Sequence, residues 1–243
     1  MKVLGVCSYR GTNYYGWQKQ VGFISVQSQI EEVLSKIYDT QINIFGSGRT
    51  DAGVHAYRQY FHYVVEKEKD LSQLMYAMNK MLPEDIRILS LEKVNDDFHA
   101  RYSAMKKIYE YQILLKNKDP FMFDKAYLYP MDLDVDLLKQ ALSKFVGEHN
   151  YQDFTSKEED ENGFMRTIYN IEVKQEDNLL KIRFEGNGFM RYQIRNMIGS
   201  ALMVASKKEN LSFIDYHLSN KQREIVSYKS PACGLYLVDV LYK

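Results

Sequence analysis

Apolar residues recur along the chain with two kinds of spacing. In some segments they return every third or fourth position, which predicts amphipathic helices, and in others they form β-branched or aromatic runs, which predict strands. Helices are expected over residues 25–38, 71–82, 134–146 and about 189–205. Strands are expected over residues 3–9, 42–45, 57–65, 86–94, 108–113, 167–173, 179–184 and 235–242.

The predicted strands and helices alternate without long Gly- or Pro-rich linkers and without a convincing internal repeat. This order indicates an α+β chain of two packed subdomains, although the pattern alone does not fix the topology. We place the division between residues 98 and 99. It gives an N-terminal α/β subdomain, residues 1–98, and a C-terminal α/β subdomain, residues 99–243.

The composition is that of a folded protein. Of the 243 residues, 45% are hydrophobic and 26% are charged, which argues against a disordered chain. No apolar run approaches the roughly 20 residues that span a bilayer. The two cysteines, Cys7 and Cys233, lie far apart without metal-like spacing. We therefore expect two reduced thiols in a cytoplasmic protein.

Charge does not by itself select a class of function. Lys plus Arg equals Asp plus Glu at 32 each, whereas nucleic-acid binders are often basic overall. The local arrangement decides whether phosphates are bound, because charge is screened over about 8 Å at physiological salt. Basic residues cluster at Arg101 with Lys106 and Lys107, Arg191 with Arg195, Lys207 with Lys208, and Lys221 with Arg223.

The segment from Gly46 to Ala56 is the most specific motif of the chain. Three glycines and two alanines surround one carboxylate, Asp51, and Arg49 lies two residues before it. Small residues allow a tight turn and the close approach of a bulky substrate. A bare Gly-Arg-Thr-Asp is equally typical of an ordinary turn. The full string is far more specific, and it favours a catalytic carboxylate.

The run from Arg49 to His55 matches, without a departure, the catalytic-loop signature of the TruA family of tRNA pseudouridine synthases, which the chain therefore resembles. Further blocks that resemble this family occur in the family's order over nearly the whole chain. They are Tyr9 with Gly11–Gln18 and Gln27, Phe98–Ala104, Lys107–Tyr111, Phe189–Gly199 and Pro231–Leu237.

Two segments depart from the family pattern. Residues 151–155 are one or two residues longer than the usual form. Met190-Arg191-Tyr192 stands where the family often has a histidine pair, so the resemblance transfers no function to Arg191 or Tyr192.

The resemblance implies a pseudouridine synthase fold, in which two RRM-like α/β subdomains share a central, mainly antiparallel sheet with a catalytic cleft between them. It also implies an isomerase that converts uridine to pseudouridine in the anticodon stem-loop of tRNAs, at positions 38–40. A homodimer that uses no cofactor and no metal is expected on the same basis.

The chemistry of this isomerisation explains the residue types. A glycosidic N–C bond is broken and remade as C–C, with no net redox change, so the reaction requires neither a metal nor a nucleotide cofactor. A carboxylate suits such work because it can add covalently to an electrophilic carbon and then leave. Asp51 is the only acid in the signature loop, and we assign it as the nucleophile. Attack at C6 of the base and attack at C1′ of the ribose both remain open.

By resemblance, Arg195 pairs with Asp51, which would hold the carboxylate in place and favour its ionised form. Tyr109 takes the place of the family's active-site tyrosine. It could stack on the target base, and its phenol could relay a proton from C5. Arg49 could occupy the space that the flipped base leaves and contact phosphates. Arg101, Lys106 and Lys107 are expected to extend a positive stripe for tRNA.

Three alternatives stay open, the first within the same family and the other two from other classes. The chain could modify a different RNA, it could be an RNA-binding protein without activity, or it could be a metal-dependent hydrolase built on Asp51, His55 and His62. The intact Arg49-Thr50-Asp51 with Tyr109 and Arg195 disfavours the second. Loose spacing without a Cys or Glu partner disfavours the third. We interpret His55 as a hydrogen-bond partner that fixes the loop.

Overall fold

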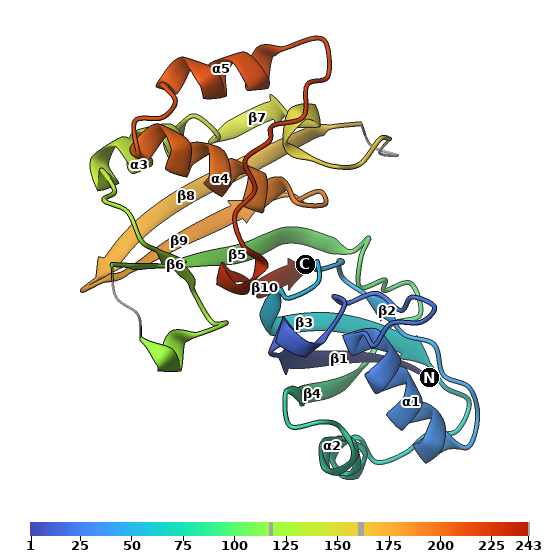
Figure 1. Cartoon of the computed structure of the whole chain (residues 1–243). Coiled ribbons are helices and arrows are strands. Elements are labelled where there is room, and N and C mark those ends of the chain that lie inside the picture. Colours follow the sequence, from blue (N-terminus) through green and yellow to red (C-terminus); the bar gives the residue numbers. More distant parts are fainter. Residues whose placement is uncertain (117–118, 160–162, 243) are drawn as a thin grey trace. The chain divides into compact units, whose positions relative to one another are not determined.

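The computed structural model describes residues 1–116, 119–159 and 163–242 (Figure 1). The chain forms two compact units, Met1–Met105 with Tyr236–Lys243, and Lys106–Leu235. The C-terminal strand β10 (Leu235–Tyr242) pairs in parallel with β3 (His55–Val64) of the first unit. The predicted division at residues 98 and 99 had placed this strand with the second half, because strand pairing over such a sequence separation leaves no local signal.

In the first unit, β1 (Lys2–Tyr9) lies between β3 and β4 (Ile86–Val94) and is antiparallel to both. A two-residue strand, β2 (Phe45–Gly46), pairs with β3 just before the Asp51 loop. The unit also contains α1 (Val26–Tyr38), α2 (Leu71–Met81) and a short 3-10 helix, Gly11–Asn13.

Helix α1 shows why these segments are helical. Its Ser25 N-cap accepts a hydrogen bond from the backbone N–H of Ser28, and the Ser28 hydroxyl accepts one from the backbone N–H of Ser25. Such a capping box satisfies two N–H groups that a helix end leaves unpaired. Val26, Ile30 and Leu34 then form a fully buried stripe at helical spacing.

In the second unit, four strands pair antiparallel in the order β5-β9-β8-β7. Their bounds are β5 (Ala104–Leu115), β7 (Gly147–Asn150), β8 (Met165–Glu176) and β9 (Leu179–Gly186), and β6 (Tyr127–Tyr129) pairs in parallel with β5. The helices are α3 (Val135–Ser143), α4 (Gln193–Ala205) and α5 (Leu211–Ser219), with 3-10 helices at Pro120–Met122, Gln152–Phe154 and Ala232–Gly234.

A chain segment between α5 and β10 runs along α4 (Figure 1). A Cβ added at Gly199 of α4 would lie 2.5 Å from the carbonyl oxygen of Tyr228, so the backbones touch there. Four residues earlier on α4, Arg195 donates from Nε to the Ser230 carbonyl at 2.9 Å. The N–H and hydroxyl of Ser230 both donate back to the Arg195 carbonyl at 3.0 Å. These contacts hold residues 228–230 against the first half of α4.

The predicted α+β class is confirmed, and each unit has a mainly antiparallel sheet with helices. The predicted helices and most strands match within a few residues. Of residues 42–45, only Phe45 lies in a strand. The sequence prediction omitted β6, β7 and α5, which are short; α5 buries only Ile214 and His217. The predicted cleft between two subdomains stays a prediction.

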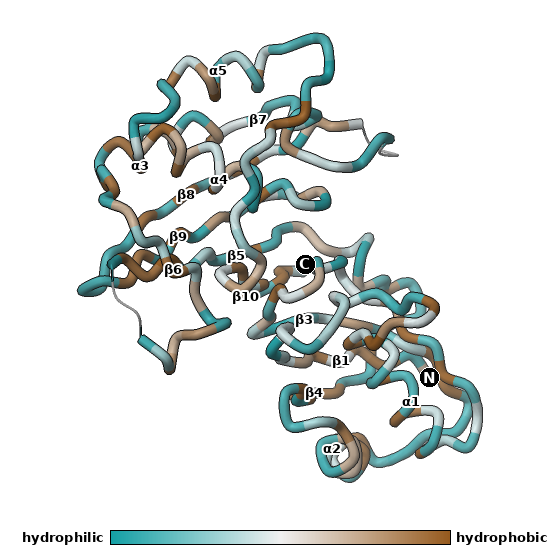
Figure 2. Tube along the Cα trace, in the orientation of Figure 1, coloured by the Kyte–Doolittle hydropathy of each residue, from teal (hydrophilic) through white to brown (hydrophobic). Residues whose placement is uncertain are grey.

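Apolar residues are spread over the elements of both units in Figure 2. Within the described ranges, no helix has the length and apolar character that crossing a membrane requires.

Candidate active site

Asp51 lies on the loop between β2 and β3, and its side chain is half-buried. The two residues before it differ: Arg49 is exposed, whereas Thr50 is buried. The Thr50 hydroxyl is hydrogen-bonded to the phenol of Tyr9 at the end of β1, with 2.8 Å between the oxygens. Asp51 therefore directly follows a residue that is anchored to the sheet.

The segment from Gly11 to Trp17 packs directly on this loop. A Cβ at Gly11 would overlap the carbonyl oxygen of Val54, and one at Gly16, whose φ is +82°, would overlap that of Thr50. The Trp17 N–H donates to the Thr50 carbonyl at 3.2 Å. Both glycines are needed because only glycine permits such backbone contact. The loop backbone is thus fixed on each side of Asp51.

A buried glutamine supports the start of the loop. Gln59 on β3 is fully buried; its Oε1 accepts from the Ser47 hydroxyl at 2.7 Å, and its Nε2 donates to the Gly48 carbonyl at 2.9 Å. The sequence analysis missed Gln59, because a glutamine in a strand pattern carries no signal of this role.

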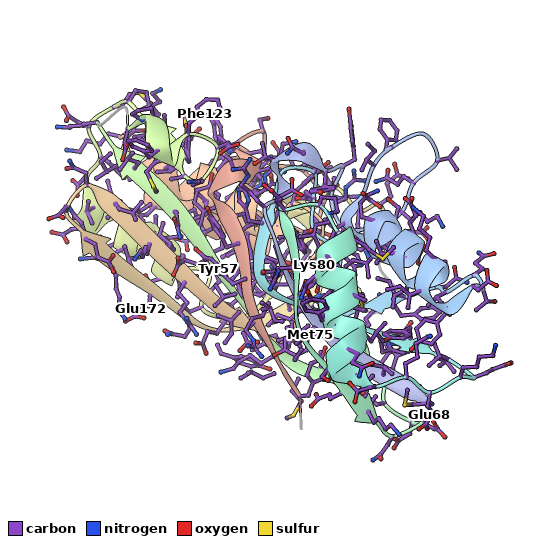
Figure 3. The ribbon with its side chains drawn as sticks, turned by 90° about the horizontal axis from the view of Figure 1, so that it is seen from below. Tyr57, Glu68, Met75, Lys80, Phe123 and Glu172 are labelled. Carbon is purple, nitrogen blue, oxygen red and sulfur yellow. The ribbon has the colours of Figure 1, made fainter. Side chains whose placement is uncertain are left out.

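His55 fixes the end of the loop. Its Nδ1 accepts a hydrogen bond from the Gly11 N–H at 3.1 Å, and its ring stacks on Tyr236 of β10 with centroids 4.7 Å apart. Tyr57, labelled in Figure 3, also stacks on Tyr236, at 4.9 Å. These contacts support the interpretation of His55 as a loop-fixing residue.

His62 is held by ring packing and by hydrogen bonds with the backbone of Ala100 and Phe45. Its Nδ1 accepts from the Ala100 N–H at 3.2 Å, and its ring lies 5.2 Å from that of Phe45 and 4.6 Å from that of His99. Burial, with the nearby His99 and Lys2, lowers the pKa of His62 to about 4. Among the described residues there is no group of three or more His, Cys, Asp or Glu side chains that could hold a metal.

In the second unit, Tyr109 lies on β5 opposite Phe184 of β9. Its ring is 7% exposed and meets the ring of Phe189 edge-on at 5.3 Å. Tyr111 lies two residues on, on the same face; it is fully buried, and its phenol donates to the Pro231 carbonyl at 2.8 Å. Of the two motif tyrosines, Tyr111 is fully buried and bonded within the protein, whereas 7% of the surface of Tyr109 is exposed.

The predicted phosphate-binding residues differ in their surroundings. Lys106 on β5 forms an ion pair with Glu185 at 2.8 Å, and its hydrogen bond is the main cause that lowers the pKa of Glu185. Lys107 is half-buried on the other face of the strand. Arg101 is exposed, with its guanidinium 5.4 Å from the ring of Tyr102. Lys106 is therefore partly neutralised within the protein.

Arg195 lies in the first turn of α4 and is half-buried. Its Nε donates to the Ser230 carbonyl, and its guanidinium carbon lies 5.3 Å from the centre of the Tyr192 ring. Neither Ser230 nor Tyr192 was predicted to support it. By unit, Arg49, Asp51 and Arg101 belong to the first, and Lys106, Lys107, Tyr109 and Arg195 to the second. The pairing of Asp51 with Arg195 stays a prediction.

Known proteins resemble the chain over nearly its whole length. A family model described as tRNA pseudouridine synthase matches residues 6–103 and 141–243. A protein named tRNA pseudouridine synthase A from Streptococcus uberis is 36% identical over 242 residues, 98% of this chain and 97% of that protein. Proteins with similar names from Protochlamydia amoebophila and Staphylococcus aureus are 37% and 34% identical, covering 97% and 98% of this chain and 94% and 89% of their own lengths.

His62 should make the first unit less stable in acid. Its pKa of about 4 in the folded protein lies below the ordinary value of 6.5, so the unfolded chain binds its proton more readily. The free energy of unfolding should therefore fall as the pH drops from about 6.5, and this loss should level off below about 4. In His62→Asn, the amide oxygen can still accept from Ala100 without titrating, so this component of the pH dependence should disappear.

Urea unfolding at a series of pH values, followed by tryptophan fluorescence, measures the free energy of unfolding. Trp17 is a suitable probe because it is the single tryptophan and is buried in the same unit as His62. The slope that His62 contributes cannot exceed about 1.4 kcal/mol per pH unit. His149→Asn, on β7 of the second unit, is the control and should leave the Trp17 profile unchanged. An identical pH profile for the parent protein and His62→Asn would contradict the prediction.

Proposed function

The chain belongs to the tRNA pseudouridine synthase family, whose enzymes isomerise uridine to pseudouridine, and we propose that its targets are uridines in the anticodon stem-loop of tRNAs, with Asp51 as the nucleophile. The match of the family model over residues 6–103 and 141–243 carries this proposal. It includes the whole Asp51 loop. A homologue that modifies a different RNA is the nearest alternative.

Asp51 suits covalent catalysis because its loop is held from both sides. A carboxylate that adds to C6 or C1′ must approach one face of the nucleoside, and a fixed position removes the entropy cost of finding it. The contacts of Gly11, Gly16 and Thr50 supply that rigidity. The glycosidic N1–C1′ bond breaks, the base turns, and a C5–C1′ bond forms; C5 loses a proton and N1 gains one, so that the product is an isomer of the substrate. The bond to Asp51 breaks within the same cycle, which returns the free carboxylate.

Arg195 pairs with Asp51 in the proposed site. Its Nε is bound to the Ser230 carbonyl, which fixes the plane of the guanidinium. An arginine held in this way presents its remaining N–H groups as a fork that matches a carboxylate. Such a pair keeps Asp51 ionised and therefore nucleophilic.

Tyr109 stacks on the target base or relays the C5 proton in this proposal. The edge-on contact with Phe189 holds the ring, so that a base would meet a rigid partner. Arg49, which is exposed, stacks in the space that the flipped base leaves, which offsets part of the few kcal/mol that unstacking costs. Arg101, Lys106 and Lys107 contribute to phosphate binding.

The reaction needs no cofactor, because the substrate carries all its atoms and electrons. The cytoplasm, where two thiols stay reduced, is the proposed location. We further propose a homodimer, since the family resemblance implies one and two copies could hold more of a tRNA than one.

Unmodified tRNA transcripts incubated with the purified protein should gain pseudouridine in the anticodon stem-loop. Reverse-transcription stops after carbodiimide treatment map these positions. Asp51→Asn should abolish the product while tRNA affinity falls little, because an amide is a very poor nucleophile and phosphates supply most of the binding energy. Asp97→Asn, an exposed acid of the same unit, is the control. Turnover by Asp51→Asn within about tenfold of the parent, only about 1.4 kcal/mol, would exclude Asp51 as nucleophile.

Variants of Tyr109 separate its two candidate roles. If the phenol relays a proton, Tyr109→Phe should bind tRNA normally and lose most of its turnover. If the ring only stacks, the Phe variant stays active, and Tyr109→Ala loses about 1–3 kcal/mol of base stacking. Single-turnover rates at saturating enzyme make this comparison, with Tyr169→Phe, an exposed tyrosine on β8, as control. Full activity of both variants would remove Tyr109 from the site.

The dimer and the phosphate contacts predict two solution measurements. Light scattering should give twice the mass of 28.6 kDa. The affinity for tRNA should fall steeply with salt, with a slope on logarithmic axes of about 0.7–0.9 per bound phosphate. A monomer at all concentrations would contradict the dimer, and an affinity indifferent to salt would contradict the proposed positive stripe.

A further inference from the structure

Three basic side chains surround the ring of Tyr192 at the start of α4. The distances to the ring centre are 4.3 Å from Lys229 Nζ, 4.8 Å from Arg191 Cζ and 5.3 Å from Arg195 Cζ. Arg191 also donates from an Nη to the phenol oxygen of Tyr192 at 3.0 Å. We call Arg191, Tyr192, Arg195 and Lys229 the Tyr192 cluster.

Backbone contacts hold the members of this cluster in place. Tyr192 has a left-handed conformation, φ +64°, which is uncommon outside glycine, and its carbonyl accepts from the Asn196 N–H at 2.8 Å. The Arg191 carbonyl accepts from the Thr155 hydroxyl at 3.0 Å. Lys229 follows Tyr228, whose carbonyl touches Gly199, and precedes Ser230, which is bonded to Arg195. The three cations are therefore brought together by the fold.

The charges of Arg191 and Lys229 are not neutralised within the part of the chain that the structure describes. Both side chains are exposed, and neither forms an ion pair with a described carboxylate. Arg191 and Lys229, with charged groups 4.8 Å and 4.3 Å from one ring centre, repel each other, since salt screens charge only over about 8 Å. The ring face attracts cations and offsets part of this repulsion. An anion bound at the cluster would remove the rest.

We propose that the Tyr192 cluster binds a backbone phosphate of the tRNA, with Arg191 and Lys229 as its two exposed ligands. This inference rests on the proposed function and adds residues to which the family resemblance assigns no role. A guanidinium and an ammonium together suit a phosphodiester, because the first offers a planar fork and the second a mobile point charge. Arg195, in the first turn of α4, is both a member of the cluster and the arginine that we propose to pair with Asp51.

The salt dependence of tRNA affinity tests the cluster. In the double variant Arg191→Gln with Lys229→Gln, the slope of log Kd against log salt should fall by about 0.7–0.9 for each phosphate that the variant no longer binds. The effect should fall on KM rather than on kcat, because neither side chain is assigned a step in the chemistry. Arg191→Lys with Lys229→Arg keeps both charges and should restore most of the slope.

Lys139→Gln with Lys144→Gln is the matched control. It removes two positive charges from the same unit, but these lysines form ion pairs with Asp136 and Asp215. The control should keep the parent slope. Circular dichroism and thermal unfolding of every variant establish that all of them are folded.

The outcomes separate this inference from the proposed function. If the parent forms pseudouridine and the double variant keeps its slope and KM, the cluster does not bind phosphate and the proposed function stands. If the parent forms no pseudouridine in any tRNA, the proposed function fails, while a reduced slope still supports the cluster as an RNA site. An equal reduction of slope in the control would overturn the inference, because it would show a general effect of net charge.

Discussion

The backbone from Gly11 to Trp17 lies directly against the loop that carries Asp51, and much of the first unit is arranged around that contact. Side chains at Gly11 or Gly16 would overlap the carbonyls of Val54 and Thr50. The same pair of segments is joined by the hydrogen bond from Gly11 to His55. A loop of small residues would otherwise be free to move, and a catalytic carboxylate needs a fixed position. The position of the loop is thus constrained by contacts between backbones at Gly11 and Gly16.

In the second unit, a glycine likewise allows close backbone contact, here at α4. Gly199 allows the chain at Tyr228 to touch the helix, and the reciprocal hydrogen bonds between Ser230 and Arg195 fix the register. Both residues of the proposed pair, Asp51 and Arg195, thus lie close to a glycine contact and a short set of hydrogen bonds. In each case, the side chain is positioned by a segment distant in sequence. Positioning of this kind is expected where geometry decides rate.

The sequence predicted the elements well wherever periodicity was strong. Strand 86–94 was predicted with the bounds that it has, because its pattern is bordered by clear turns. The Asp51 loop was found because a carboxylate among small residues is a local signal. Pairing of β10 with β3 was not predictable, since it joins residues that are far apart in the chain. Gln59, Ser230 and Lys229 were missed for a related reason: their roles depend on partners that only the fold supplies.

The structure shows that local ion pairs account for part of the zero net charge. Many lysines are paired locally, as Lys36 is with Glu32 and Lys93 with Glu68. Exposed pairs of this kind add little stability, but each one cancels a positive charge at the surface. A phosphate-binding surface is then recognised as a place where several basic side chains lie close together without neighbouring carboxylates. The net charge of the chain does not reveal such a place, because it counts paired and unpaired lysines alike. We propose Arg191 and Lys229 beside Tyr192 as such a place for this reason, although the sequence showed Arg191 only within one of several basic clusters.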